Sequence, residues 1–171
     1  MRKLLLATAI SFGLVVAASG SGLAASAGEN HAAYMWVVGA VPAGSSDTAM
    51  APDGSTVTLK GHGVLQAGPG SSANGGGTYS MSSGGSGTWT VTGMLGFVSY
   101  GSGAAQGLPA DFFGGETKLR VHLSNGADGV LTITCELGSP PAGHMEGVTL
   151  ILGQGGEFTM ADGGNTVFVH Q

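Results

Sequence analysis

The sequence has few charged residues and very few cations. Charged residues make up 9% of the 171 residues, against about 25% in an average globular protein, and Lys and Arg together number 5. Arg2 and Lys3 lie at the N-terminus, so only Lys60, Lys118 and Arg120 remain for the rest of the chain. Because nucleic-acid binding depends on clustered cations that neutralise phosphates, this scarcity argues against a nucleic-acid partner.

Cysteine is almost absent, and the common catalytic motifs are missing. Cys135 is the single cysteine, which excludes an intrachain disulfide and a zinc site with paired cysteines. Its phase with Leu131, Ile133 and Leu137 predicts a buried, inert thiol. The sequence has no Gly-x-Ser-x-Gly elbow, phosphate loop or His-Glu-x-x-His motif. We therefore predict no metal and no cofactor.

Glycine, in contrast, is abundant. The chain has 34 glycines, about a fifth of its residues against ~7% on average, without the three-residue period of collagen. The densest part is a Gly/Ser-rich segment at residues 68–87. Its composition predicts a flexible loop, or an irregular edge hairpin around Thr78–Met81.

The N-terminus has the order of segments that is typical of a secretory signal peptide. Met1–Lys3 is positive, Leu4–Ala18 is uncharged, and small residues end at Ala27. The apolar stretch is shorter than the ~20 residues of a membrane-spanning helix. We therefore predict a signal peptide at residues 1–27, cleaved near Ala27. The remainder, 28–171, is then one secreted or periplasmic domain without a transmembrane segment.

The apolar residues of this domain recur with period two, which predicts strands joined by glycine turns. A continuous apolar run from Tyr34 to Val41 is typical of a strand buried on both faces. Further on, one face of a predicted strand carries Trp89, Val91, Leu95 and Phe97, which alternate with Thr88, Thr90, Thr92 and Met94. We predict an all-β, antiparallel fold of about eight or nine strands, either a small barrel or a two-sheet sandwich.

Turn positions in the C-terminal half predict specific strand registers. A three-residue loop at Asn125–Ala127 places Leu119 opposite Ile133 and keeps the apolar side chains on one face. A turn at Gly153–Gly155 reverses the chain, so that the strand before the turn pairs with the strand after it. The segment Asp162–Asn165 suits a two-residue Gly-Gly turn that places Met160 opposite Val167. Residues 117–170 thus form a predicted antiparallel meander.

Polar side chains that could form a site are dispersed. Lys118, Arg120 and His122 share the face opposite the apolar row of their strand. In a sandwich this row is solvated, whereas in a barrel with a polar lumen Arg120 and His122 would face an anionic or carbonyl-bearing ligand. His144 and Glu146 lie in a loop and form a His-x-Glu pair. The pair could supply two metal ligands, or a base and its orienting carboxylate, or be an exposed polar loop.

Two adjacent aromatic residues, Phe112 and Phe113, follow a Leu-Pro sequence. We expect at least one of them to pack on the core or cap an open end. Exposed together, they would form a lip for a ligand.

Three classes of function fit these observations. The first is a secreted, non-catalytic β-domain that binds a small apolar ligand or a partner surface. The second is a small-barrel enzyme of the isomerase or cyclase type, whose candidate catalytic residues are Arg120, His122, His144 and Glu146. The third is a glycine-rich structural surface protein. The sequence favours the first, with Phe112, Phe113, Arg120 and His122 as candidate ligand-binding residues, because no catalytic constellation is evident.

Overall fold

The computed structural model describes residues 32–40 and 45–171; the predicted leader at 1–27 and Val41 lie outside these residues. The described chain is almost entirely β structure. Its elements are, in chain order, β1 (Ala33–Val38), β2 (Asp47–Met50), β3 (Thr56–Gln66), β4 (Ser72–Met81), β5 (Ser86–Ser102), the 3-10 helix η2 (Gly103–Gln106), β6 (Phe112–Leu123), β7 (Asp128–Cys135), β8 (Gly147–Leu152), β9 (Glu157–Phe158), β10 (Met160–Ala161) and β11 (Thr166–His170).

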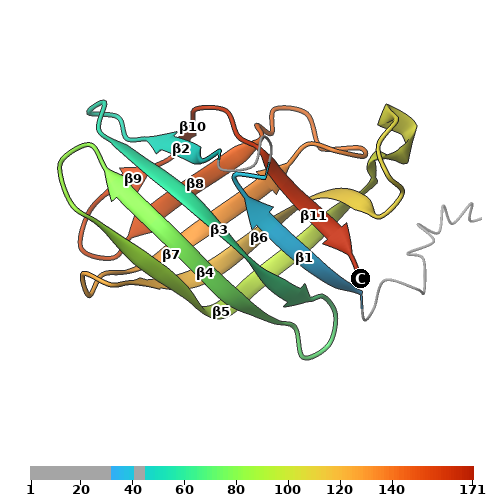
Figure 1. The fold of residues 1–171 in the computed structure, drawn as a ribbon, viewed down its shortest axis with the longest axis horizontal. Coiled ribbons are helices and arrows are strands. Elements are labelled where there is room, and N and C mark those ends of the chain that lie inside the picture. The colour runs from blue at the N-terminus through green and yellow to red at the C-terminus, as the bar shows by residue number, and fades with distance from the viewer. Residues whose placement is uncertain (1–31, 41–44) are drawn as a thin grey trace, which may run out of the picture.

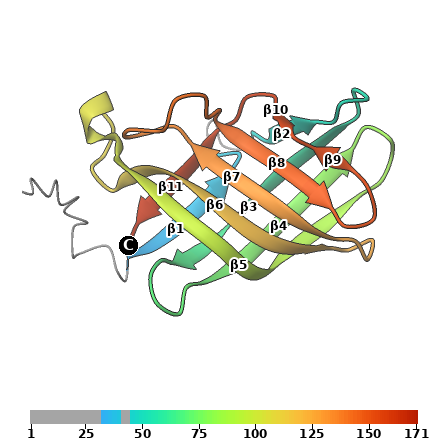
Figure 2. The same ribbon diagram turned by 180° about the vertical axis from the view of Figure 1, so that it is seen from behind.

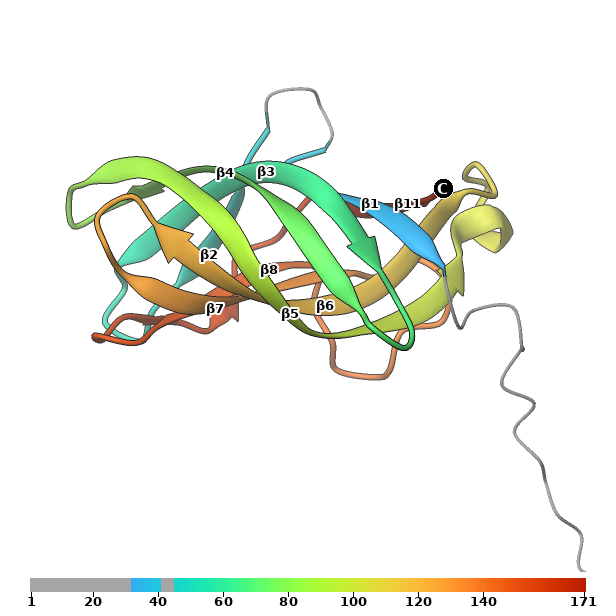
Figure 3. The same ribbon diagram turned by 90° about the horizontal axis from the view of Figure 1, so that it is seen from below.

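The strands form a single antiparallel sheet that curves into a barrel-like ring (Figures 1 and 3). Pairing runs from β3 through β4, β5, β6, β11 and β1 back to β3, so these six strands form a closed circuit. Strands β2 and β10 extend one side of the circuit, and β7, β8 and β9 extend the other. The predicted all-β, antiparallel class is confirmed, but the described part of the chain has eleven strands and not the predicted eight or nine.

Large side chains fill the inside of the ring. The bulkiest fully buried residues are Trp36, Trp89, Tyr34, Phe168, Leu59, Leu65, Leu119, Leu123, Leu131, Ile133 and Leu150. On β1, the side chains of Tyr34, Trp36 and Val38 are buried, but Met35 and Val37 are only half-buried. The prediction that this strand is buried on both faces is therefore wrong, because its second face lies on the outside of the ring.

The Gly/Ser-rich segment 68–87 is not a loop along its whole length. Its centre forms β4, which pairs with β3 along ten residues and with β5 on its other edge. A side chain at Gly63 or Gly75 would collide with the ring of Trp36. The glycines thus allow two neighbouring backbones to lie directly against a buried tryptophan, a function that composition alone does not indicate.

The long strand β5 changes phase because of β-bulges. Three register shifts interrupt its pairing with β6. As a result Met94 packs against the core together with Trp89 and Phe97, whereas Leu95 points outward and is 47% exposed. The prediction that Leu95 shares a face with Trp89 and Phe97 is wrong, since each bulge inserts one unpaired residue and reverses the alternation.

The β6–β7 hairpin has the predicted faces but a different register. Leu119 lies opposite Leu131, not opposite Ile133, which pairs with Thr117. The three loop residues are 124–126, and Gly126 adopts φ +91° at the third position, as in a hairpin with a glycine bulge. The prediction is off by two residues. A shift of two preserves the face of every side chain, so the apolar pattern could not distinguish these registers.

The meander ends earlier than predicted. The turn at Gly153–Gly155 is confirmed, and β9 pairs with β8 as expected. Met160, however, pairs with Met50 of β2, and β11 pairs with β1 and β6, so Met160 and Val167 are not partners. The segment 162–165 is therefore a crossover and not a hairpin turn. The local Gly-Gly sequence predicts a hairpin, but it contains no information about the free edge of β2.

Candidate functional site

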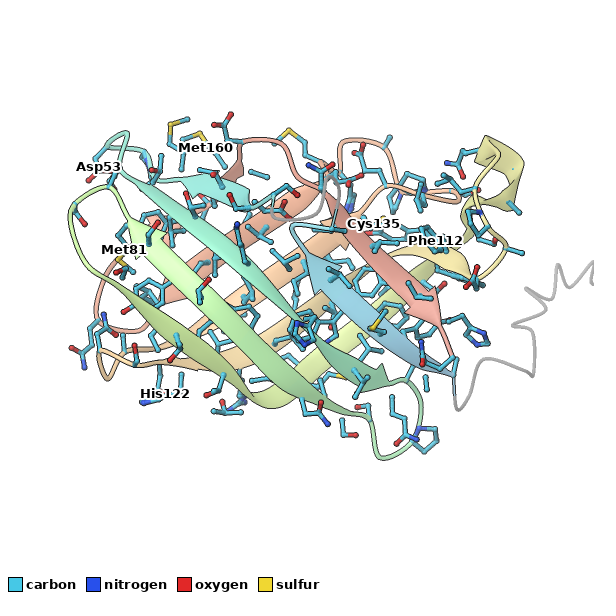
Figure 4. All side chains as sticks on the ribbon, in the orientation of Figure 1. Asp53, Met81, Phe112, His122, Cys135 and Met160 are labelled. Atoms are coloured by element: carbon cyan, nitrogen blue, oxygen red, sulfur yellow. The ribbon has the colours of Figure 1, made fainter. Side chains whose placement is uncertain are left out.

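The predicted Lys-Arg-His row lies on the outer face of β6. Thr117, Leu119, Val121 and Leu123 point inward and are buried, so the alternating side chains of Lys118, Arg120 and His122 are exposed. Figure 2 shows the face of the sheet to which they belong, formed by β5, β6, β7 and β8. Figure 4 shows that His122 points away from the barrel. The solvated position of the row is confirmed, and the alternative of a polar lumen is wrong because apolar side chains fill the interior.

A groove of about 610 Å³ crosses this outer face. Its centre is a cross-strand row in which Arg120 lies opposite Val130, and Val130 lies opposite Ile151. Leu95 lines the groove from β5, and the side chains of Leu95 and Ile151 are 47% and 46% exposed. The groove therefore combines aliphatic side chains in contact with water and one guanidinium group.

His122 and Asp128 also line the groove. They are cross-strand neighbours, and His122 Nδ1 lies 2.7 Å from Asp128 Oδ1. Arg120, by contrast, forms no ion pair with any carboxylate of the described residues. Its guanidinium is thus the cation in the groove that is available to an anion.

His144 and Glu146, predicted as a possible pair, point to different places. His144 Nδ1 lies 3.1 Å from the Tyr100 hydroxyl and 3.4 Å from Glu116 Oε2. Glu146 accepts hydrogen bonds from the backbone N–H groups of Thr166 and Glu136. Within the described residues, no three His, Cys, Asp or Glu side chains are grouped as a metal site requires. The two residues therefore do not form one metal or acid–base site.

Glu146 instead lines a small pocket at one end of the barrel, with a volume of about 200 Å³. Phe112 and Cys135 line the same pocket, and Figure 4 shows both at this end. Burial raises the pKa of the Glu146 carboxyl, although the two N–H donors oppose this shift. Burial also raises the pKa of Cys135 to about 11, which agrees with the predicted inert thiol.

The two adjacent phenylalanines separate. Phe113 packs against the core, with its ring centroid 5.6 Å from that of Tyr34 and 5.4 Å from that of His170. Phe112 faces the small pocket. One aromatic residue packs on the core, as expected, and the alternative of a shared aromatic lip is wrong because consecutive strand residues point to opposite faces.

Sequence reasoning missed a buried acid, Asp47. Its side chain is 1% exposed, and Oδ1 accepts a hydrogen bond of 2.8 Å from the backbone N–H of Asn165, while Oδ2 has no partner among the described residues. Burial raises its pKa. One sequence signal could have found it, since Asp47 lies two residues before the apolar Ala49 and so shares its face of the strand.

No helix in the described part of the chain is long and apolar enough to cross a membrane.

Comparison with known proteins adds no functional assignment. Protein-family, curated-protein and solved-structure comparisons give no match to this chain.

Proposed function

We propose that this protein is a secreted, non-catalytic binding domain whose outer groove takes a small, mainly apolar ligand that carries an anionic group. The observation that carries the proposal is the position of Arg120 between exposed aliphatic side chains. Apolar surface in contact with water is a source of binding free energy when a ligand covers it. A guanidinium without an ion-pair partner adds a charge-assisted hydrogen bond to a carboxylate.

Charge also supports an anionic ligand at this place. Outside the predicted leader, Lys60, Lys118 and Arg120 are the cations of an acidic chain. Two of the three lie side by side on the outer face of β6, and Lys118 forms an ion pair with Glu116 at 3.2 Å. The groove is thus the place on the described surface where an anion meets an uncompensated cation.

The two alternative functions have less support. The candidate catalytic residues are distributed over three places, because Arg120 and His122 line the groove, His144 contacts Tyr100, and Glu146 lines the end pocket. Gly61, Gly63 and Gly75 lie against the rings of buried tryptophans, so at least these glycines have a packing role that does not require a structural matrix function.

Octanoate is a suitable probe, because it combines an apolar chain with one carboxylate. We expect amide chemical shifts of groove residues on β5–β8 to change on titration, and Arg120→Gln to weaken octanoate binding about tenfold. Lys60→Gln is the matched control, since it removes one positive charge from β3 outside the groove. Octanol tests the apolar contribution and should bind Arg120→Gln and the parent protein equally. Absence of shifts in the groove with both probes would refute the proposed function.

The secreted location rests on the predicted leader. Mass spectrometry of the protein from its native host should find a mature N-terminus within a few residues of Gly28. Cytoplasmic material that begins at an intact Met1 would contradict this location.

A further inference from the structure

A second hollow on the same outer face has a different character from the groove. It has a volume of about 310 Å³ and lies over β6, β7 and β8, next to the loop that precedes β8. We call it the threonine cleft. Its polar lining consists mainly of Glu116, Lys118, His144, Thr132, Thr149 and Thr159.

The ionisable side chains of the threonine cleft contact one another. Lys118 Nζ lies 3.2 Å from Glu116 Oε1, and the other carboxylate oxygen, Oε2, lies 3.4 Å from His144 Nδ1. The Tyr100 hydroxyl, 3.1 Å from the same nitrogen, further fixes the imidazole ring. A ligand with a net charge would compete with one of these contacts, so the cleft favours a neutral ligand.

The threonine hydroxyl groups have free hydrogen-bonding capacity. Thr132 and Thr149 are cross-strand neighbours on β7 and β8. Neither these two hydroxyls nor that of Thr159 has a hydrogen-bond partner among the described residues. A β-branched side chain has few rotamers on a strand, and each hydroxyl can both donate and accept. The cleft therefore presents a fixed set of groups that match a ligand with several hydroxyls.

An apolar group completes the lining. The Met145 side chain borders the cleft and is 58% exposed. A flexible thioether is able to adapt to an irregular apolar surface such as the C–H groups of a sugar ring. From these observations we infer that the threonine cleft binds the pyranose ring of a neutral sugar, independently of the groove ligand.

A titration with D-glucose, D-galactose and D-mannose, followed by amide chemical shifts, tests this inference. We expect saturable shifts in the millimolar range at Thr132, Thr149 and His144 with at least one sugar. The double variant Thr132→Val/Thr149→Val keeps the shape and strand propensity of both side chains but removes their hydroxyls, and it should weaken binding about tenfold. Thr90→Val, an exposed position on β5 outside the cleft, is the matched control and should leave binding unchanged.

Two results would overturn the inference: no saturable shifts with any of the three sugars, or equal affinity in the parent protein and the double variant. A thermal-unfolding midpoint of the double variant close to that of the parent ensures that lost binding does not reflect lost folding. The octanoate titration reports on the groove, whereas the sugar titration reports on the threonine cleft. Failure of one proposal is therefore distinguishable from failure of the other.

Discussion

Trp36 and Trp89 stack inside the barrel, with ring centroids 5.7 Å apart and ring planes inclined by 22°. The indole N–H of Trp89 donates to the backbone carbonyls of Lys60 and Thr78, each at 3.2 Å. Both rings lie against glycines of β3 and β4, so the stack depends on backbone positions without side chains.

The tryptophan stack makes glycine replacement costly at specific positions. A Cβ at Gly61 would lie 2.6 Å from the carbonyl oxygen of Gly76 and 2.5 Å from Cζ2 of Trp89. Overpacking of this kind destabilises a protein by typically ~1–3 kcal/mol, so Gly61→Ala should lower the free energy of unfolding by that amount. Gly96→Ala is the control, since no atom lies within 4 Å of its Cβ position, and urea denaturation measures both.

The outer cationic row should contribute little to stability. Arg120 is exposed without an ion-pair partner among the described residues, and His122 forms an exposed pair with Asp128. We expect Arg120→Ala to change the free energy of unfolding by at most about 0.5 kcal/mol, and His122→Ala by at most about 1 kcal/mol. A loss of several kcal/mol in thermal denaturation of either variant would indicate that the row is buried.

Stability should depend on pH through the buried acid Asp47 and the half-buried acid Glu146. Burial raises the pKa values of Asp47 and Glu146, although backbone N–H donors oppose both shifts, and the negative charges of Glu136 and Asp47 further raise the pKa of Glu146. The folded state therefore holds protons that the unfolded state has released, so the free energy of unfolding should fall as pH rises through the raised pKa values. Conversely, acidification from neutral pH toward ordinary carboxyl values near ~4 should stabilise this part of the fold.

Two substitutions at Asp47 separate charge from hydrogen bonding. Asp47→Asn keeps an acceptor for the N–H of Asn165 and should weaken the pH dependence of the unfolding midpoint. Asp47→Ala leaves that N–H without its acceptor and should cost about 1–3 kcal/mol at neutral pH. An unchanged pH profile in Asp47→Asn would contradict the assignment of the proton to this residue.

The single thiol should resist modification in the folded protein. Cys135 is 1% exposed, and burial raises its pKa to about 11, so little thiolate exists at neutral pH and reagents cannot reach it. A disulfide reagent such as DTNB should react with one equivalent after denaturation and far more slowly before it. Rapid, complete reaction of the native protein would show that the thiol is accessible.

Period-two alternation determined the class of fold and the face of many side chains. On β6 and β7, the apolar pattern correctly separated Leu119 and Ile133 from the outward Arg120 and His122. The same pattern could not determine the register of this hairpin, because a shift of two residues preserves every face. It also placed Leu95 on the face of Trp89 and Phe97, because a bulge depends on the pairing with β6 and not on local sequence.

Tertiary structure alone decided how the chain closes and where the candidate sites lie. The crossover at 162–165 replaces a well-formed local turn signal because Asp47, far away in the sequence, accepts the N–H of Asn165, and β2 supplies an edge for Met160. Likewise, the centre of the Gly/Ser-rich segment is a strand because it pairs with β3 and β5, and Gly75 lets its backbone lie against the ring of Trp36. Local sequence encodes which face of a strand is apolar, whereas partners distant in the chain determine which strands meet and which outward side chains become neighbours.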